Sequence, residues 1–227
     1  MNAERLLAHY DQIADAPDAI PRLRRFVLDL AVRGKLVPQD PSEEPASELL
    51  NRIAAERARL VKAGQIAALS GARGSEGKNP ALSIPSRWCT ATVQDVLYEI
   101  QTGPFGSSLH QSDYQRGGTP VINPASIQDG AIVPIAKMAV GRAILDRLSS
   151  FRLRAGDIVM GRRGEMGRCA LVTDREAGWL CGTGSLILRP SPLMFGPFLV
   201  LLIGSPFELV NLCARPKRLL IADERAA

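Results

Sequence analysis

The sequence predicts an α+β fold: an N-terminal helical region with a long coiled-coil-type helix, then a linker, then a mixed α/β domain. Apolar residues recur at helical spacing before residue 64, whereas after residue 83 they form short runs rich in Val, Ile and Leu. The stretch between them is rich in Gly, Ala, Ser and Lys and cannot bury enough apolar surface to hold one conformation. We therefore expect boundaries at residues 1–63, 64–83 and 84–213, with an irregular tail at 214–227.

The first predicted helix lies in IPRLRRFVLDLAVRGKL. Pro21 suits a first helical turn, and Gly34 is placed to end the helix. Between them runs an apolar stripe made of Leu23, Phe26, Val27, Leu30 and Ala31.

The second predicted helix opens at Pro45 and carries its own apolar stripe, with charged residues on the other faces. The stripe consists of Leu49, Leu50, Ile53, Leu60 and Val61, whose spacing follows the three- to four-residue period of one helix face. Such a stripe needs burial. Two interpretations stay open: a helical hairpin packed on the same domain, or a long helix that pairs with another helical segment.

The domain after the linker has the pattern of a mixed sheet with tight turns. Gly, Pro and Asp separate the strand-like runs TPVINPASI, GAIVPI, GDIVMG, RCALVTD and GSLILRP. The segment PFLVLLIGSPFELVNLC follows them, and we expect it to form one or two helices.

Composition limits the function. The net charge of +5 permits an acidic partner such as nucleic acid, although a solvated basic surface explains it equally well. Four cysteines without a CxxC pair and two histidines cannot form a structural zinc site at the usual spacings, so we expect buried thiols in a reducing compartment. No signal peptide or membrane span is recognisable, so we expect a cytoplasmic protein with no membrane partner.

Three motifs resemble catalytic signatures but lack residues that those signatures require. The stretch TGPFGSS, residues 102–108, lacks the lysine and the glycine spacing of a Walker phosphate loop, and its serines are not in a GxSxG turn. NPAS at residues 123–126 lacks the aromatic residue of the adenine methyltransferase signature. EGK at residues 76–78 lies in the linker without a second carboxylate. We predict no catalytic residue, metal or cofactor.

Binding chemistry remains. In GDIVMGRRGEMGRCALV a strand leads into a turn with Arg162 and Arg163, whose guanidinium groups suit phosphate oxygens and the edge of guanine. The alternative is a hairpin whose arginines face solvent and bind no ligand.

The order of the segments resembles the specificity subunits of type I restriction-modification systems. FVLDLAVRGKLVPQDPSEEPASELLNRIAAERARLVKAG resembles their conserved helical region. IPSRW, TGPFGSSLHQSDYQRGGTPVINPASIQDG and LRAGDIVMGRRGEMGRCALV resemble their target recognition domain. The resemblance extends from Met1 to about Leu212.

The resemblance implies a non-catalytic subunit that binds double-stranded DNA at a bipartite site. It would direct modification (methyltransferase) subunits there, and through them the restriction subunit. The implied DNA-binding residues are Gly103, Phe105, Gly106, Ser107, Ser108, Asn123, Arg162, Arg163 and Arg168. The implied partner-binding residues are Leu49, Leu50, Ile53, Leu60 and Val61.

The chain departs from the family in one respect. A full member usually carries two recognition domains and two helical regions, whereas this sequence has one of each, so we expect a half-length or truncated member. A second copy or a separately encoded half-subunit would then complete the site. A stand-alone DNA-binding module and a non-functional remnant remain alternatives.

Overall fold

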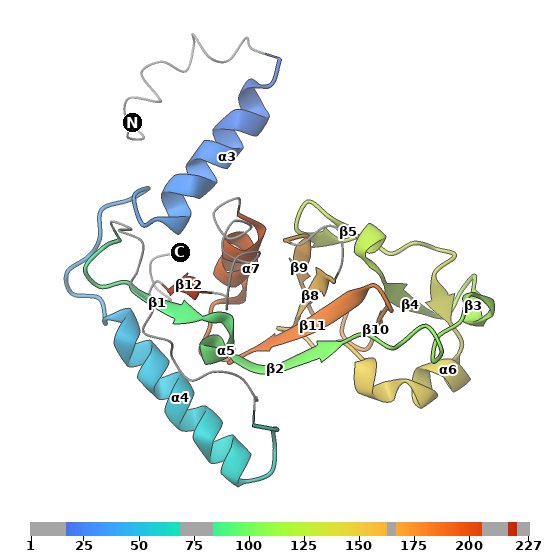
Figure 1. Cartoon of the computed structure of the whole chain (residues 1–227). Helices are drawn as coiled ribbons and strands as arrows, with labels where there is room; N and C mark the ends of the chain where they lie inside the picture. Colours follow the sequence, from blue (N-terminus) through green and yellow to red (C-terminus); the bar gives the residue numbers. More distant parts are fainter. Residues whose placement is uncertain (1–16, 69–83, 163–166, 206–217, 222–227) are drawn as a thin grey trace.

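The structure is a computed structural model that describes residues 17–68, 84–162, 167–205 and 218–221. It confirms a mixed α/β protein, with helices at the start of the chain and short strands after residue 88 (Figure 1). Most of the predicted linker, residues 69–83, lies outside the described residues, as do Arg163 and Cys213.

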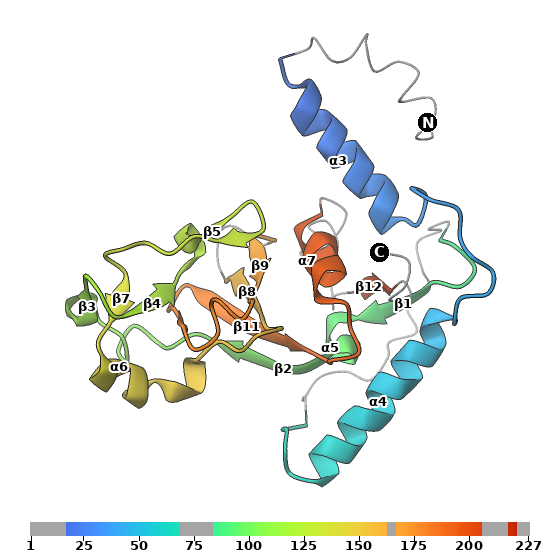
Figure 2. The same ribbon diagram turned by 180° about the vertical axis from the view of Figure 1, so that it is seen from behind.

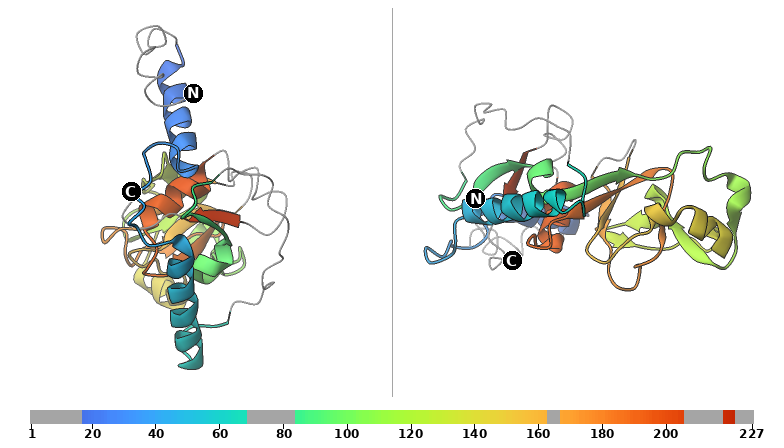
Figure 3. Two further views of the ribbon diagram at one scale, coloured as in Figure 1. Left: turned by 90° about the vertical axis from the view of Figure 1, so that its left-hand side faces the viewer. Right: turned by 90° about the horizontal axis from the view of Figure 1, so that it is seen from below.

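The two predicted N-terminal helices are α3 (Ala19–Val32) and α4 (Ala46–Lys62). They extend in opposite directions from the body of the protein, so they do not form a hairpin with one another (Figures 1 and 3). Gly34 follows the end of α3 with a φ of +63°, and a Cβ atom there would lie 2.5 Å from Pro85 Cγ. Glycine is therefore required both by the left-handed backbone and by close packing.

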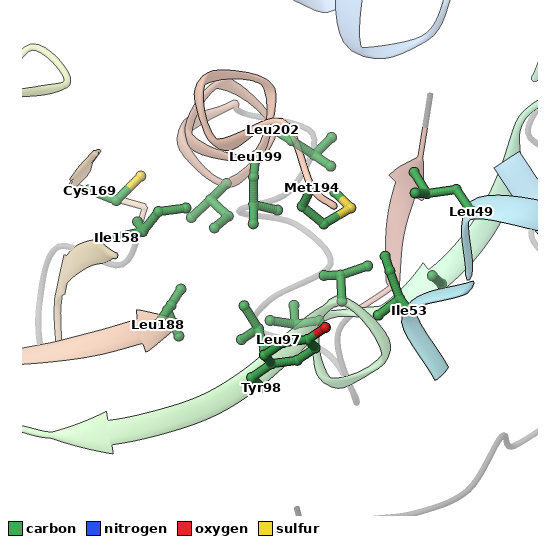
Figure 4. Close-up of a cluster of buried hydrophobic side chains, with 14 of the residues drawn as sticks. Leu49, Ile53, Leu97, Tyr98, Ile158, Cys169, Leu188, Met194, Leu199 and Leu202 are labelled. Atoms are coloured by element: carbon green, nitrogen blue, oxygen red, sulfur yellow. The ribbon is translucent and has the colours of Figure 1, made fainter. Parts of the chain in front are cut away.

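Helix α4 packs on the same chain. Leu49 and Ile53 are buried in the main hydrophobic cluster, and Arg57 donates a hydrogen bond from Nη1 to the carbonyl of Gln94. Figure 4 shows Leu49 and Ile53 approaching this cluster from α4, near Met194 and Leu97. Leu50 and Leu60 are half-buried and pack against the same cluster, so of the two interpretations left open, packing on the same domain holds for these four side chains. The described residues show no coiled-coil pairing of α4.

The central sheet has the order β2-β11-β8-β9 and is antiparallel throughout. Its strands are β2 (Leu97–Thr102), β8 (Ile158–Gly161), β9 (Cys169–Leu171) and β11 (Ser185–Pro190). Alternate side chains face opposite ways. Ile158, Met160 and Leu188 join the cluster that contains α7 (Gly196–Gly204), whereas Val159 and Ile187 join the cluster that contains Ile122 and Cys181. Figure 2 shows α7 and the second sheet on opposite sides of β8 and β9.

The second sheet has the order β10-β4-β7-β3. Its strands are β3 (Tyr114–Gln115), β4 (Thr119–Ile122), β7 (Ala139–Val140) and β10 (Leu180–Cys181), and β4 pairs with β10 in parallel. Beside it, β5 (Ile127–Gln128) and β6 (Ala131–Ile132) form a hairpin. Asp129 and Gly130 both have positive φ, as the tight turn of an Asp-Gly hairpin requires. Helix α6 (Arg142–Arg147) packs through Leu145 in a third hydrophobic cluster. The other buried members of this cluster are Leu109, Val121, Val140, Leu148 and Leu180.

The segment predicted as an irregular tail contains a strand. Residues Arg218–Ile221 form β12, which pairs antiparallel with β1 (Cys89–Thr92). The short helix α5 (Val93–Val96) follows β1, and Asp95 caps it by accepting hydrogen bonds from the backbone and hydroxyl of Thr92. The apolar sequence Arg218–Ile221 suits a strand, but its partner is distant in sequence, so local pattern did not reveal the pairing.

Candidate nucleic-acid interface

Three loops meet at one end of the central sheet: the one after β2, the one between β8 and β9, and the one before β11. Because the strands are antiparallel, the ends of β2 and β8 coincide with the starts of β11 and β9. Residues 103–108, 162, 167–168 and 182–184 therefore leave the sheet at the same end. We call this set of residues the loop end. It gathers most of the residues that the family resemblance marks as DNA-binding.

The segment between β10 and β11 organises the loop end. The backbone N–H of Gly103 donates to the carbonyl of Ser185 at 2.9 Å, and the backbone N–H of Arg162 donates to the carbonyl of Gly184 at 2.9 Å. Gly103 and Arg162 therefore lie on either side of β11. Since neighbouring strands lie about 4.8 Å apart, the two residues are roughly 10 Å from each other. The sheet thus fixes the spacing between the residue 103–108 loop and Arg162.

Residues 103–108 divide into a buried base and an exposed tip. Gly103 and Pro104 are buried, and a Cβ atom on Gly103 would lie 2.0 Å from the carbonyl oxygen of Gly182. Gly103 therefore permits close packing within the protein. Phe105, Gly106 and Ser107 are exposed, and a Cβ atom on Gly106 would meet nothing within 4 Å. The tip is the part of this loop that a ligand can reach.

Ser108 lies at the edge of the tip. It is half-buried, and its carbonyl accepts a hydrogen bond from Arg147 Nη2 at 3.1 Å. Arg147 also forms an ion pair with Asp113 at 3.5 Å. The contact ties the loop to α6, so the loop is held at both of its ends.

Asn123 directs its side chain into the protein. Its Nδ2 donates to the hydroxyl of Tyr114 at 3.3 Å and lies 3.8 Å from the sulfur of Met138. Its Oδ1 would lie 2.2 Å from a Cβ atom on Gly182, so the amide packs directly on the segment that organises the loop end. Through these contacts, Asn123 helps to hold residues 182–184 in position.

The arginines of the loop end differ in exposure. Arg162 is half-buried, and its Nε is buried with no hydrogen-bond partner among the described residues. Arg168 is exposed and donates from Nη1 to the carbonyl of Pro124 at 3.3 Å. Arg168 also lines a groove of about 700 Å³, together with Leu28 of α3 and Leu201 of α7. The loop end is therefore basic on the side of β8 and β9.

The segment Gly182–Thr183–Gly184 has no counterpart among the residues that the sequence predicts for the site. Gly184 begins the strand-like run GSLILRP, and no motif includes Thr183. Two glycines around a threonine between apolar runs are a turn signal that could have identified it. The structure places half-buried Thr183 between the loop of residues 103–108 and Arg162.

The implied partner-binding residues fall into two groups. Leu49 and Ile53 are buried in the chain's own core, whereas Leu50, Leu60 and Val61 are half-buried. Leu50 and Leu60 also pack against this core. Only the second group retains accessible apolar surface on α4.

Other chemistry is sparse in the described part of the chain. No group of three or more His, Cys, Asp or Glu side chains there could hold a metal ion. No helix in that part is long and apolar enough to cross a membrane. Burial raises the pKa values of Cys169 and Cys181 to about 12, so both thiols stay protonated at neutral pH.

Comparisons with known proteins point to one group. No protein-family model matches the chain. A segment of 78 residues is 51% identical to the specificity subunit of the type I restriction enzyme EcoEI from Escherichia coli, over 34% of this chain and 13% of that protein. A segment of 47 residues is 72% identical to the EcoAI specificity subunit from the same species, over 21% of this chain and 8% of that protein.

Solved structures give weaker likenesses. The HsdS subunit from Thermoanaerobacter tengcongensis aligns with a TM-score of 0.46 and 14% identity, over 97% of this chain and 46% of that chain. The type I restriction-modification S subunit from M. genitalium aligns with a TM-score of 0.40 and 13% identity, over 98% of this chain and 50% of that chain. The chain thus spans about half the length of these subunits. Over these two matched segments, the chain is similar to the specificity subunits of type I restriction enzymes.

Proposed function

We propose that this chain is a non-catalytic DNA-recognition subunit of a type I restriction-modification complex, and that it binds double-stranded DNA through the loop end. The observation that supports this most strongly is the convergence of Ser107, Arg162, Thr183 and Arg168 at one end of the central sheet. Ser107, Arg162 and Thr183 are distant in sequence. Sequence similarity to specificity subunits supports the same role.

The loop end has the chemical groups that DNA binding needs. Arg162 and Arg168 provide cationic donors for phosphate oxygens, and Ser107 provides an exposed hydroxyl. Gly106 leaves room for the sugar-phosphate backbone to come close. Phosphate contacts set the register on the duplex, and the few side chains at base edges then read the sequence.

We propose that α4 contributes the contact with the modification subunits, and through them with the restriction subunit. Leu50, Leu60 and Val61 are the half-buried apolar side chains of the predicted stripe. Their burial by a partner would complete the helix face that Leu49 and Ile53 begin.

A stand-alone DNA-binding module is the second candidate. The burial of Leu49 and Ile53 within the chain supports it, because α4 already has a surface to pack on. If two copies assemble by twofold symmetry, they must read identical half-sites, and the target is an interrupted palindrome. A separately encoded half-subunit would instead give an asymmetric bipartite target.

The test is reconstitution of the full chain with separately purified modification subunits, followed by sequencing of methylated positions in genomic DNA. We expect methylation at one recurring interrupted motif, and none from the chain alone with S-adenosylmethionine. A recurring motif that does not depend on this chain would contradict the recognition role. Tight sequence-specific binding by the chain, without any association with modification subunits, would favour the stand-alone module or a remnant of a larger subunit.

A further inference from the structure

The tip of the residue 103–108 loop presents an aromatic ring to solvent. Phe105 is 68% exposed, the highest value among the large hydrophobic side chains of the described residues. A single exposed apolar residue is common in soluble proteins, so exposure alone says little. The surroundings of Phe105 make it unusual.

The backbone around Phe105 is held in place on both sides. Before it, Gly103 and Pro104 are buried, and the Gly103 N–H is bonded to Ser185. After it, the carbonyl of Phe105 accepts hydrogen bonds from the N–H groups of Ser108 at 2.8 Å and Leu109 at 3.2 Å. Leu109 is itself buried in the third hydrophobic cluster. The ring is therefore exposed by an ordered turn that is anchored in two places.

Nothing crowds the ring's side of the tip. Gly106 carries no side chain, its Cβ position is open space, and Ser107 is small and exposed. The cations of the loop end lie across the same end of the sheet, with Arg162 one strand beyond Ser185. An apolar projection is thus held at the same end of the sheet as groups that suit phosphates.

A phenyl ring cannot donate or accept a conventional hydrogen bond, so a phosphate oxygen is not its partner. The apolar surfaces of a duplex are the faces of the bases, exposed where a base step opens, and the methyl group of thymine. Phe, Leu, Ile and Met side chains of DNA-binding proteins insert between base steps in this way. We propose that Phe105 inserts against the bases as an apolar wedge at one base step of the recognised DNA. This inference rests on the proposed function.

The apolar wedge and the arginines of the loop end contribute to DNA binding in different ways. Contacts from arginines release counterions and depend on salt, whereas an apolar contact with bases does not. Loss of the ring should therefore reduce affinity for the recognised sequence without changing the salt dependence. The loss should be about five- to a hundredfold, the range for one aromatic–base contact.

The experiment uses the full chain and a pool of randomised 40-base-pair duplexes. Wild type, Phe105→Ala and Phe105→Leu each select sequences from the pool, and affinities for the wild-type selection are measured at several salt concentrations. Phe195→Ala is the matched control, because Phe195 is a phenylalanine with 40% exposure that follows the opposite end of β11. Permanganate, which oxidises unstacked thymines, maps any opened base step.

We expect Phe105→Ala to lose preference at one or two adjacent base positions and to lose permanganate reactivity there. Phe105→Leu should keep part of the base preference and part of the permanganate reactivity. Phe195→Ala should match wild type. Selection of the same motif with unchanged affinity by Phe105→Ala would overturn the wedge while leaving DNA recognition intact. Uniform weakening on all duplexes with a smaller salt slope would also overturn it, because the loop would then act on the backbone. If the wild-type chain recovers no motif, the proposed function fails and the wedge fails with it.

Discussion

Arg189 holds a buried carboxylate in the central sheet. Its Nε and Nη2 bond both oxygens of Asp157, at 2.8 and 3.0 Å, and its Nη1 forms an ion pair with Glu99. The Asp157 side chain is only 1% exposed and that of Arg189 is 15% exposed. Arg189→Leu would leave the Asp157 charge buried without its partner, so we expect a loss of about 3–5 kcal/mol in unfolding free energy.

Chemical denaturation measures this loss. Arg142→Ala serves as the control, because its ion pair with Asp146 is between side chains that are 85% and 52% exposed. Such surface pairs contribute little, so the control should unfold with wild-type stability. Equal stability of Arg189→Leu and wild type would contradict a structural role for this cluster.

Cys169 and Cys181 should respond to pH and to thiol reagents in a defined way. Burial raises both pKa values from 9.0 to about 12. A folded-state pKa above the unfolded value means that the stabilisation is complete below pH 9 and is lost as pH rises toward 12. At pH 8 we expect alkylation of both residues to be slow in the native protein and fast in denaturant, as measured by peptide mass spectrometry. Native-state alkylation at the rate of an unfolded thiol would contradict their burial.

Residue types alone do not reveal the intramolecular contacts of two of the implied DNA-binding residues. Gly103 and Asn123 were marked by the family resemblance, yet Gly103 is buried against Gly182 and the Asn123 amide is bonded to Tyr114. A glycine that permits close approach to DNA and one that permits close approach to a neighbouring strand look the same in sequence. Only the partner of the backbone, which depends on topology, distinguishes them.

Helix α4 offers a comparison between a core position and a surface position. Ile53 is fully buried in the main cluster, whereas Val61 is half-buried at the end of the helix. The carboxylate of Ile53→Asp would lack a partner in an apolar surrounding, so we expect loss of several kcal/mol and unfolding of the sheet domain. Val61→Asp should keep the fold and, if the proposed partner surface is correct, should weaken association with modification subunits.

Circular dichroism and co-purification with the modification subunits distinguish these outcomes. If Ile53→Asp kept a folded sheet domain and lost only association, α4 would be an assembly helix that the domain does not need. If Val61→Asp left association unchanged, the partner surface would lie elsewhere.

The bounds of the helices were more predictable than their partners. Pro45 and the apolar period predicted a helix near residues 46–63, and α4 spans Ala46–Lys62. The same stripe is compatible with burial against the chain's own sheet or against another helix. Periodicity defines which face is buried, but the covering surface comes from distant residues such as Leu97 and Leu199.

For the whole molecule, the change from helical spacing to short apolar runs correctly predicted helices at the start of the chain and strands after residue 83. These strands form several sheets instead of the one mixed sheet that was expected. The arrangement of the sheets could not be read in this way. The parallel pairing of β4 with β10 and the antiparallel pairing of β1 with β12 join segments far apart in sequence, and short strands carry too little local information to specify them. The loop end depends on this arrangement, so the sequence did not reveal that segments so far apart in the chain leave the sheet at the same end.

The salt dependence of DNA binding tests the loop end most directly. Arg162 and Arg163, of which Arg163 lies outside the described residues, are replaced together by alanine, and the exposed adjacent pair Arg24 and Arg25 on α3 is the control. Each phosphate contact contributes about one unit to the slope of log affinity against log salt. Fluorescence anisotropy with duplex DNA should give a slope that is smaller by up to about two units for the loop-end variant and unchanged for the α3 variant. An unchanged slope for the loop-end variant, or an equal reduction in both, would contradict DNA binding at the loop end.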